Sequence, residues 1–461
     1  MDPLLRTFLD LAASAPEYPA AVAPGKEWTR SRVAGWVHNW GSYWRDNIKQ
    51  RRLGTGAIVA MRVDPGPGFL AAFLACRMAG ACVLLLEPEM LAEEQQRVAA
   101  ALGACALWNS SCVEDENASP ANSIQWLSGE QTLPEAACLK MTSGSSGSPA
   151  GVITSPRSLV VDGEALIRSM GLEGNDRIFA AVSMSHAYGL SVIASPFWLL
   201  GCTIVYPGQG EKLHAARELQ ATVFPSVPSW YEGQLDAIAP GAMPSSLRLM
   251  LSAGAPLRPI TARAWQKRHS LGIHVLYGSS ECGAITFDRL GDAACRGSVG
   301  TPVEGVNVDL DQDGHVVVHS NAVALGYFPR GADRDTRITP GCFQTEDIAS
   351  FDGEELHLQG RRSQWINVKG KKVNPREIEG VLEKHPAILE VAVIGKMLPK
   401  GRGEAIRAVI ACEQDHLSFR DVVSWCQPRL SRHKYPRSVV FVRNLPRTGR
   451  GKLDRQLMHS L

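Results

Sequence analysis

Hydrophobic positions near the N-terminus follow the period of a helix. Between residues 29 and 46, apolar side chains recur every three or four positions, which predicts an amphipathic helix with one buried face. That face carries Val33, Trp36, Val37, Trp40 and Trp44. We interpret the stripe as core packing, because aromatic side chains at helical spacing fill interiors more often than they form a platform for a ligand.

Short apolar runs and helical patterns alternate after this helix. The pattern predicts helices at residues 67–78, 92–102 and 156–170, and a loop at residues 108–134. Strands are expected at residues 57–62, 81–86, 137–141, 152–154, 178–182, 203–206, 221–223 and 247–251. This alternation is typical of parallel strands joined by helical crossovers. We therefore predict an α/β fold with doubly wound parallel sheets.

The pattern changes toward the C-terminus. Residues 297–327 alternate between apolar and polar positions, which predicts a β subdomain with a hairpin. After Gly360-Arg361-Arg362-Ser363 a small α+β unit follows, with helices expected at 375–384 and 419–430 and strands at 389–394, 406–413 and 438–441. A chain of 461 residues is too long for a single compact hydrophobic core. We therefore predict a large domain at 1–361 and a small, mobile lid domain at 362–461.

Charge and composition narrow the range of partners and compartments. The formal net charge is +2 and no long basic run is present, so we expect no nucleic-acid partner. The apolar residues 69–86 include Arg77 and Gly80, so they predict a buried helix and strand and no membrane span. The eleven cysteines are scattered and the N-terminus lacks a leader pattern. We therefore expect a cytoplasmic protein with reduced thiols.

Residues 141–151 form a dense run of hydroxyls and glycines between two predicted strands. The run reads Met-Thr-Ser-Gly-Ser-Ser-Gly-Ser-Pro-Ala-Gly, and it contains Thr142, Ser143, Gly144, Ser145, Ser146 and Gly147. Glycines allow consecutive N–H groups to converge on an anion, and the hydroxyls add further donors. A phosphate-wrapping loop and a flexible Gly/Ser linker both fit this run on its own. A Walker loop does not fit, because no lysine follows either glycine.

Three more motifs follow in a fixed order. They are Tyr277-Gly278-Ser279-Ser280-Glu281, then Thr345-Glu346-Asp347 with Gly360-Arg361, and last Thr448-Gly449-Arg450-Gly451-Lys452-Leu453-Asp454-Arg455. Together with the loop, the chain resembles the adenylate-forming superfamily of acyl-CoA synthetases, peptide-synthetase adenylation domains and luciferases, most closely the acyl- and aryl-acid ligases. The resemblance implies ATP-dependent conversion of a small carboxylic acid to an acyl-adenylate with release of pyrophosphate. It also implies transfer of the acyl group to the thiol of CoA or of a carrier-protein phosphopantetheine.

The resemblance assigns roles around the nucleotide. Lys452 matches the catalytic lysine that bridges the carboxylate and the α-phosphate, and Glu281 matches the ligand of Mg²⁺. Asp347 matches the acceptor of the ribose hydroxyls, and Arg361 matches a residue that reaches ribose and phosphate. The remaining nucleotide contacts are implied for the loop residues 142–147, for Gly254, Ala255 and Pro256, and for Tyr277, Gly278, Ser279 and Ser280.

The resemblance also implies an acid pocket and a path for the thiol. His186 follows a predicted strand and matches a histidine beside the carboxylate pocket, with Ala187, Tyr188 and Gly278 as further substrate contacts. Ala187 stands where amino-acid-activating relatives hold an aspartate, so an aryl or a short- to medium-chain acyl acid is favoured. Gly370 matches the glycine that lines the pantetheine path, although a turn glycine would look the same.

Three positions depart from the family pattern. Ala150 replaces the usual lysine of the loop, Glu346 replaces a glycine beside the ribose acceptor, and Ser363 replaces the usual Asp or Lys of the hinge. These departures keep a non-catalytic nucleotide-binding relative open as an alternative, and a stand-alone amino-acid adenylation enzyme is a second alternative. Because Lys452 and Glu281 are both present, we favour an active carboxylate–thiol ligase.

Overall fold

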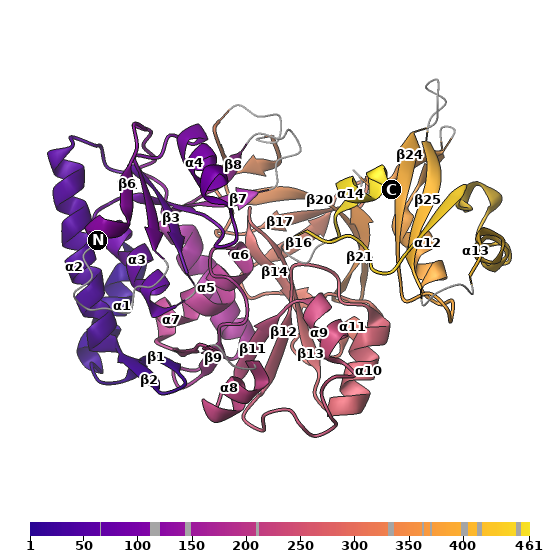
Figure 1. Cartoon of the computed structure of the whole chain (residues 1–461), viewed down its shortest axis with the longest axis horizontal. Coiled ribbons are helices and arrows are strands. Elements are labelled where there is room, and N and C mark those ends of the chain that lie inside the picture. The colour runs from indigo at the N-terminus through magenta and orange to yellow at the C-terminus, as the bar shows by residue number, and fades with distance from the viewer. Residues whose placement is uncertain are drawn as a thin grey trace. The chain divides into compact units, whose positions relative to one another are not determined.

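In the computed structural model, the chain forms two compact units (Figure 1). The first unit comprises Met1–Asp309, Val317–Gln344 and Asp352–Leu356, and the second comprises Leu310–Val316, Thr345–Phe351 and His357–Leu461. The structure describes residues 1–64, 66–110, 120–142, 149–208, 212–330, 336–361, 364–368, 371–397, 404–412, 417–448 and 453–461. The boundary after residue 361 stays a prediction.

A seven-stranded sheet forms one half of the first unit. Its order is β18-β8-β7-β4-β3-β5-β6. The strands are β3 (Ile58–Val63), β4 (Cys82–Leu85), β5 (Ala106–Ser110), β6 (Ile124–Trp126), β7 (Cys138–Thr142), β8 (Ala150–Thr154) and β18 (Tyr327–Phe328). The central strands β5, β3, β4 and β7 are parallel, whereas β6, β8 and β18 join antiparallel. The antiparallel β7–β8 pair brackets the hydroxyl-rich run.

A nine-stranded sheet forms the other half. Its order is β15-β14-β13-β12-β11-β9-β10-β1-β2. The strands are β1 (Pro19–Ala23), β2 (Lys26–Thr29), β9 (Arg177–Phe179), β10 (Thr203–Val205), β11 (Val223–Ser226), β12 (Leu249–Ser252), β13 (Ile273–Ser279), β14 (Gly283–Phe287) and β15 (Thr301–Pro302). The strands from β1 to β13 along this order are parallel. The predicted α/β fold with parallel sheets is therefore confirmed.

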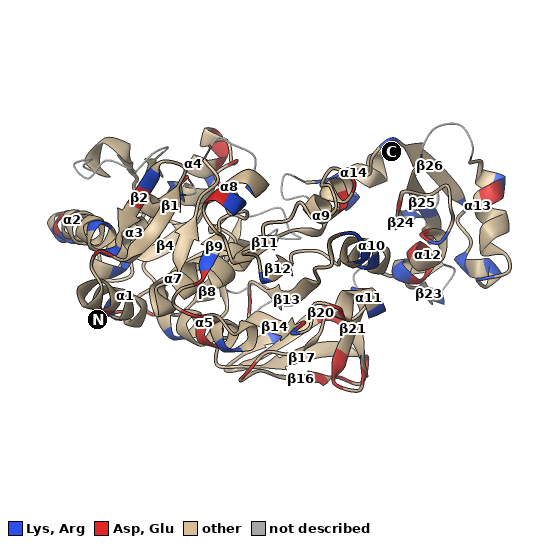
Figure 2. Ribbon diagram, turned by 90° about the horizontal axis from the view of Figure 1, so that it is seen from below, with Lys and Arg blue, Asp and Glu red and all other residues tan. Residues whose placement is uncertain are grey.

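Helices connect and cover these strands (Figure 1). They are α1 (Pro3–Ser14), α2 (Arg30–Gln50), α3 (Pro67–Met78), α4 (Ala92–Ala101), α5 (Pro156–Met170), α6 (Ala187–Gly189), the π-helix η2 (Leu190–Ala194), α7 (Ser195–Leu200), α8 (Lys212–Glu218), α9 (Pro228–Gln234), α10 (Pro259–His269) and α11 (Ala293–Arg296). The α5 helix begins and ends at its predicted signals, because the Ser155 hydroxyl accepts from the Ser158 N–H and Gly171 is left-handed. Figure 2 shows Lys and Arg positions in blue on α10, whose last turn carries Lys267 and Arg268. Cations at the C-terminal end of a helix interact favourably with the helix dipole.

The expected loop at residues 108–134 is partly wrong. It contains the end of β5, the 3-10 helix η1 (Pro120–Ser123) and β6, which pairs antiparallel with β5. Tertiary contacts determine that this segment forms a strand. The ring centroids of Trp126 and Trp44 are 5.6 Å apart, and only the folded sheet brings the two rings together. A three-residue strand carries too little periodicity to be recognised in the sequence.

A third, five-stranded sheet follows the two parallel ones in the chain. Its order is β16-β17-β20-β19, and β21 pairs with β20. The strands are β16 (Asn307–Leu310), β17 (His315–His319), β19 (Ile338–Thr339), β20 (Cys342–Asp352) and β21 (Glu355–Arg361). The Asp311 carboxylate accepts hydrogen bonds from the N–H groups of Asp313 and His315, which stabilises the turn between β16 and β17.

The C-terminal part of the second unit has its own core. Among the described residues, two small sheets, β22-β23 and β24-β25-β26, are accompanied by three α-helices and one 3-10 helix. The elements are β22 (Ile366–Val368), β23 (Lys371–Val373), β24 (Glu390–Met397), β25 (Glu404–Ala411), β26 (Ser438–Val442), α12 (Pro375–Leu382), α13 (Phe419–Cys426), the 3-10 helix η6 (Arg432–Lys434) and α14 (Arg455–Ser460). Its buried side chains include Ile378, Leu382, Val393 and Val422. In the described part of the chain, no helix combines the length and the hydrophobicity that crossing a membrane requires.

The tryptophans of α2 fill the core as the sequence predicts. Trp40 is 1% exposed, stacks on Trp36 with centroids 5.6 Å apart and meets the edge of Trp108 at 5.7 Å. The stripe therefore joins α2 to β5 by aromatic packing.

Trp40→Ala should lower the free energy of unfolding by about 3–5 kcal/mol, because a cavity forms beside the rings of Trp36 and Trp108. Lys49→Ala, on the exposed face of the same helix, should change it by less than about 0.5 kcal/mol. Chemical denaturation followed by far-UV circular dichroism measures both. Equal stabilities of the two variants would contradict the packing role of the stripe.

Candidate active site

The turn between β13 and β14 carries the motif Tyr277 to Glu281. The register of this antiparallel pair shifts between Tyr277 and Gly278, which tightens the turn. A Cβ atom on Gly278 would lie 2.5 Å from the carbonyl oxygen of Gly283, and Gly283 has a positive φ of 72°. Both glycines are therefore required by the backbone, and the turn has one well-defined shape.

Glu281 is fixed in this turn by three contacts. Its Oε1 accepts a hydrogen bond of 2.9 Å from the Tyr327 hydroxyl. Its carbonyl oxygen accepts from the Ala324 N–H at 2.7 Å, and its own N–H donates to Ser279 Oγ at 3.2 Å. Because β18 pairs with β8, Tyr327 ties the carboxylate to the strand that follows the hydroxyl-rich run.

Lys140 links the same turn to β7. The residue is only 4% exposed, and its Nζ lies 3.5 Å from the carbonyl oxygen of Ser280. Sequence reasoning missed this lysine. The sequence does carry a signal for it, because Lys140 is the single charged residue inside the apolar run from Ala136 to Met141.

Asp162 holds the turn from the side of α5. Its Oδ1 accepts the Ala284 N–H at 2.8 Å, and its Oδ2 accepts the Ser191 hydroxyl at 2.5 Å. A Cβ on Gly283 would lie 2.3 Å from Oδ1, so this glycine also makes room for the carboxylate. Asp162 was missed as well, although a carboxylate between Leu159 and Leu166 on the apolar face of a helix is an available signal.

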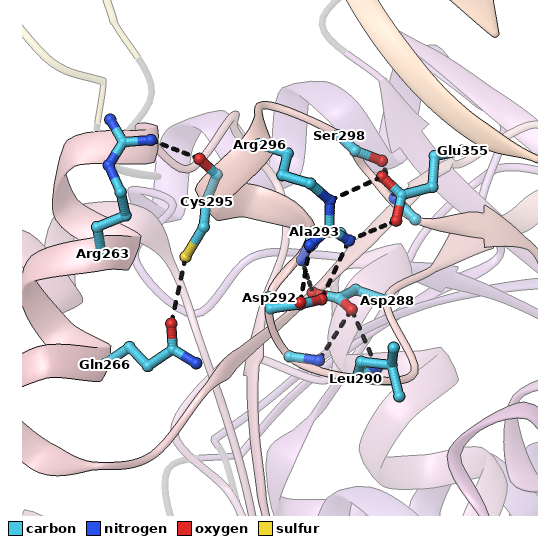
Figure 3. Close-up of polar contacts among 12 residues, drawn as sticks. Arg263, Gln266, Asp288, Leu290, Asp292, Ala293, Cys295, Arg296, Ser298 and Glu355 are labelled. Atoms are coloured by element: carbon cyan, nitrogen blue, oxygen red, sulfur yellow. Dashed lines mark hydrogen bonds and ion pairs between the residues drawn. The ribbon is translucent and has the colours of Figure 1, made fainter. Parts of the chain in front are cut away.

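The far end of β14 is anchored by a separate polar cluster (Figure 3). Asp288 accepts hydrogen bonds from the N–H groups of Leu290, Gly291 and Ala293 at 3.1, 2.8 and 2.9 Å. Burial raises the pKa of Asp288, while these donors act in the opposite direction. Arg296 lies between Asp292 and Glu355, with contacts of 2.7 and 2.5 Å. Both ends of the strand that follows Glu281 are thus held.

His186, Ala187 and Tyr188 lie where β9 leads into α6 and η2. The Nδ1 atom of His186 is 3.9 Å from Oε1 of Glu87, which follows β4. Burial raises the pKa of the Tyr188 hydroxyl well above its usual value, so this group stays neutral. Glu87 belongs to none of the sequence motifs, and its carboxylate lies beside the histidine that is expected to border the acid pocket.

Gly254, Ala255 and Pro256 form an exposed loop after β12. Gly254 has a φ of 86°, and a Cβ atom there would meet nothing within 4 Å. Small exposed residues at the end of a parallel strand leave the backbone open to a flat ring, as the expected adenine contact requires.

Asp347 and Arg361 contact each other in the second unit. The Nε atom of Arg361 donates to Oδ1 of Asp347 at 2.8 Å across β20 and β21. The Asp347 N–H donates to the Thr345 hydroxyl at 3.0 Å, which fixes the strand at this point. The two residues assigned to the ribose are therefore brought together by the fold.

Several predicted residues lie outside the described residues. They are Ser143, Gly144, Ser145, Ser146, Gly147, Ser363, Gly370 and Lys452, and the Thr142 side chain joins them. The described residues on either side of Lys452 are well anchored. Arg447 pairs with Leu453 in an antiparallel bridge, Asp454 N–H donates to Pro446 O at 2.9 Å, and Arg455 donates to Val393 O at 2.9 Å.

The chain is similar to known proteins over most of its length. The family model described as "AMP-binding enzyme" matches residues 8–328, and the model described as "AMP-binding enzyme C-terminal domain" matches residues 377–452. The chain is 28% identical to 2-succinylbenzoate–CoA ligase of Bacillus mycoides over 351 residues, which cover 73% of this chain and 72% of that one. It is 28% identical to feruloyl-CoA synthase of an Amycolatopsis species over 421 residues, covering 84% and 85%.

Solved structures share the whole fold. ATP-bound MatB from Rhodopseudomonas palustris superposes with a TM-score of 0.84 at 20% identity, covering 99% of this chain and 98% of that chain. The AMP complex of O-succinylbenzoate coenzyme A synthetase from Bacillus subtilis gives 0.81 at 21% identity, covering 98% and 97%. Since the first family model spans well over half of the sequence, the chain belongs to the AMP-binding enzyme family.

Proposed function

We propose that this enzyme activates an aryl or a short- to medium-chain acyl acid with ATP and transfers the acyl group to a thiol. The carboxylate oxygen attacks the α-phosphorus, the bond to pyrophosphate breaks, and the thiol later displaces AMP to give a thioester. The observation that carries the proposal is the bracing of Glu281 by Tyr327. The hydrogen bond holds the carboxylate beside β18, which pairs with β8, and β8 in turn pairs with β7 on the other side of the hydroxyl-rich run.

Glu281 fits the role of a Mg²⁺ ligand. Among the described residues, no group of three or more His, Cys, Asp or Glu side chains could hold a metal ion. A single fixed carboxylate suits Mg²⁺, which usually keeps several waters and takes its other ligands from substrate phosphates. When bound, the ion would neutralise charge that develops on the phosphate oxygens.

Asp347 and Arg361 suit opposite parts of a nucleotide. A carboxylate accepts both ribose hydroxyl protons, while a guanidinium donates to phosphate oxygens or to the ribose. Their mutual hydrogen bond keeps both side chains oriented before a nucleotide binds. We propose that both contact the nucleotide.

CoA is the acceptor that the relatives favour. The two curated relatives described above are named for CoA thioesters, one of a dicarboxylic aryl acid and one of a phenolic acid. The phosphopantetheine of a carrier protein presents the same thiol arm, so it is the second acceptor to test. If CoA is the acceptor, the acid, CoA and ATP suffice for the full reaction, whereas the second acceptor requires the carrier protein.

An amino-acid substrate is a second candidate with one observation in its favour. Glu87 places a carboxylate 3.9 Å from His186, and a carboxylate in an acid pocket can pair with the ammonium of an amino acid. Ala187 argues against this candidate, since the expected aspartate is missing there.

Lys452→Ala should reduce acid-dependent ATP–pyrophosphate exchange by at least about 100-fold, because the lysine ammonium stabilises charge in the adenylation transition state. Circular dichroism and thermal melting should match those of the unsubstituted enzyme. Lys384→Ala, at an exposed position of the same unit, serves as the control and should keep full exchange. Exchange that survives Lys452→Ala would remove this lysine from the mechanism.

A panel of acids in the same exchange assay separates the two substrate classes. Aryl acids and short- to medium-chain acyl acids should give exchange well above background, and α-amino acids should not, because Ala187 offers no charge to an ammonium and a buried, unpaired ammonium is strongly penalised. Stronger exchange with any α-amino acid would favour the second candidate. In that case Glu87→Gln should abolish it, since the amide carries no charge to pair with the ammonium.

Gly370→Leu should leave pyrophosphate exchange nearly unchanged and abolish thioester formation, because a bulky side chain would obstruct a thin thiol arm. High-performance liquid chromatography of acyl-CoA and of the carrier-bound thioester measures the second half-reaction. Gly380→Ala is the matched control, since a Cβ there meets nothing within 4 Å and both half-reactions should persist. Loss of both half-reactions in Gly370→Leu, or of neither, would assign Gly370 to a turn.

A further inference from the structure

Lys140 is a buried cation with very little to bind. Its side chain is 4% exposed, and its contact with the Ser280 carbonyl oxygen is long at 3.5 Å. An ammonium has three N–H donors. Among the described residues, no second acceptor and no carboxylate within ion-pair distance accompanies that carbonyl oxygen. A buried charge of this kind costs stability unless an anion or further acceptors complete it.

The position of Lys140 points to the missing anion. The residue lies in β7, two positions before the last residue of the strand, and its ammonium reaches the main chain directly before Glu281. The ammonium therefore lies between the strand that enters the hydroxyl-rich run and the turn of the proposed Mg²⁺ ligand. Phosphate oxygens held at these two elements would come within reach of its unused donors.

Ala150, which lies near Lys140 in the β7–β8 ladder, offers no charge to a phosphate. It is 1% exposed and pairs with Thr142 across the β7–β8 ladder, so its methyl group is packed inside. Lys140 pairs with Val152 in the same ladder, two residues away along each strand. Two residues of a strand span about 7 Å, a distance that an extended lysine side chain can cover.

Neighbouring charges make the cluster negative without Lys140. The Cys282 side chain is buried, and Glu281, Asp162 and Lys140 all lie close enough for their charges to act on its thiol. Two carboxylates and one ammonium thus surround one buried side chain. Removal of the ammonium would leave two negative charges beside the place where a polyphosphate has to bind.

We propose that Lys140 binds the phosphate end of the nucleotide and supplies the positive charge that position 150 lacks. This inference rests on the proposed function, because it requires a polyphosphate at the Glu281 turn. A phosphate-binding role for Lys140 also has a consequence for the stability of the ligand-free protein. A residue retained for a ligand should weaken the empty protein, whereas a residue retained for the fold should strengthen it.

Lys140→Met removes the charge and keeps the length of the side chain. Isothermal titration without acid should show at least tenfold weaker binding of ATP and of pyrophosphate with Mg²⁺, and adenosine affinity within twofold of the parent. The Tm of the ligand-free variant should equal or exceed that of the parent. Lys140→Arg should recover most of the ATP affinity. Leu139→Met, the next residue in β7, is the matched control and should bind ATP as the parent does.

The outcomes separate this inference from the proposed function. Parent-like ATP binding in Lys140→Met would overturn the inference, and so would a lowered Tm with equal losses for ATP and adenosine. Should Lys140→Met and Lys140→Gln both fail to fold, the residue belongs to the fold and the proposal is wrong. If the parent binds ATP but no acid supports pyrophosphate exchange, the proposed function fails while the titration still decides the role of Lys140.

Discussion

The hydrogen bond from Tyr327 to Glu281 is the contact on which the site depends. It joins a turn of the nine-stranded sheet to an edge strand of the seven-stranded sheet, so the two sheets share one acidic group. Without this tie the carboxylate would be free to rotate, whereas the proposed role as a Mg²⁺ ligand requires a group that its surroundings hold in place. The neighbouring contacts from Lys140 and Asp162 act on the same turn from two other elements.

Backbone geometry makes this bracing possible. Gly283 combines a positive φ with a close approach to the Asp162 carboxylate, so no larger residue could occupy the position without moving α5 or the turn. The π-helix η2 brings the Ser191 hydroxyl to the other oxygen of Asp162. Irregular helices of this kind often occur at functional sites, and here the irregular segment supports the turn that carries Glu281.

The two buried charges near the Glu281 turn, Asp162 and Lys140, differ in how well their hydrogen-bonding capacity is satisfied. Asp162 is buried but satisfied by two donors, whereas Lys140 is buried with one long contact. A well-packed core would prefer a neutral side chain at position 140. The sequence nevertheless has a lysine there, two residues along the β7–β8 ladder from the pair of Thr142 with Ala150, which fits the proposed role in phosphate binding.

The sequence by itself determined the α/β class, the stripe of α2, the limits of α5 and the family motifs, because each of these is written in local periodicity or in a run of contiguous residues. It also pointed to Glu281, Asp347 and Arg361, although only the fold showed that the last two touch. Tertiary structure alone decided the antiparallel pairing of β6, the partnership of Glu87 with His186, and the roles of Tyr327, Lys140 and Asp162. The contacts of Glu87 with His186, of Tyr327 with Glu281, of Lys140 with Ser280 and of Asp162 with Ala284 each join residues more than 40 positions apart. Nothing in local spacing records a pairing that exists only once the sheets have packed.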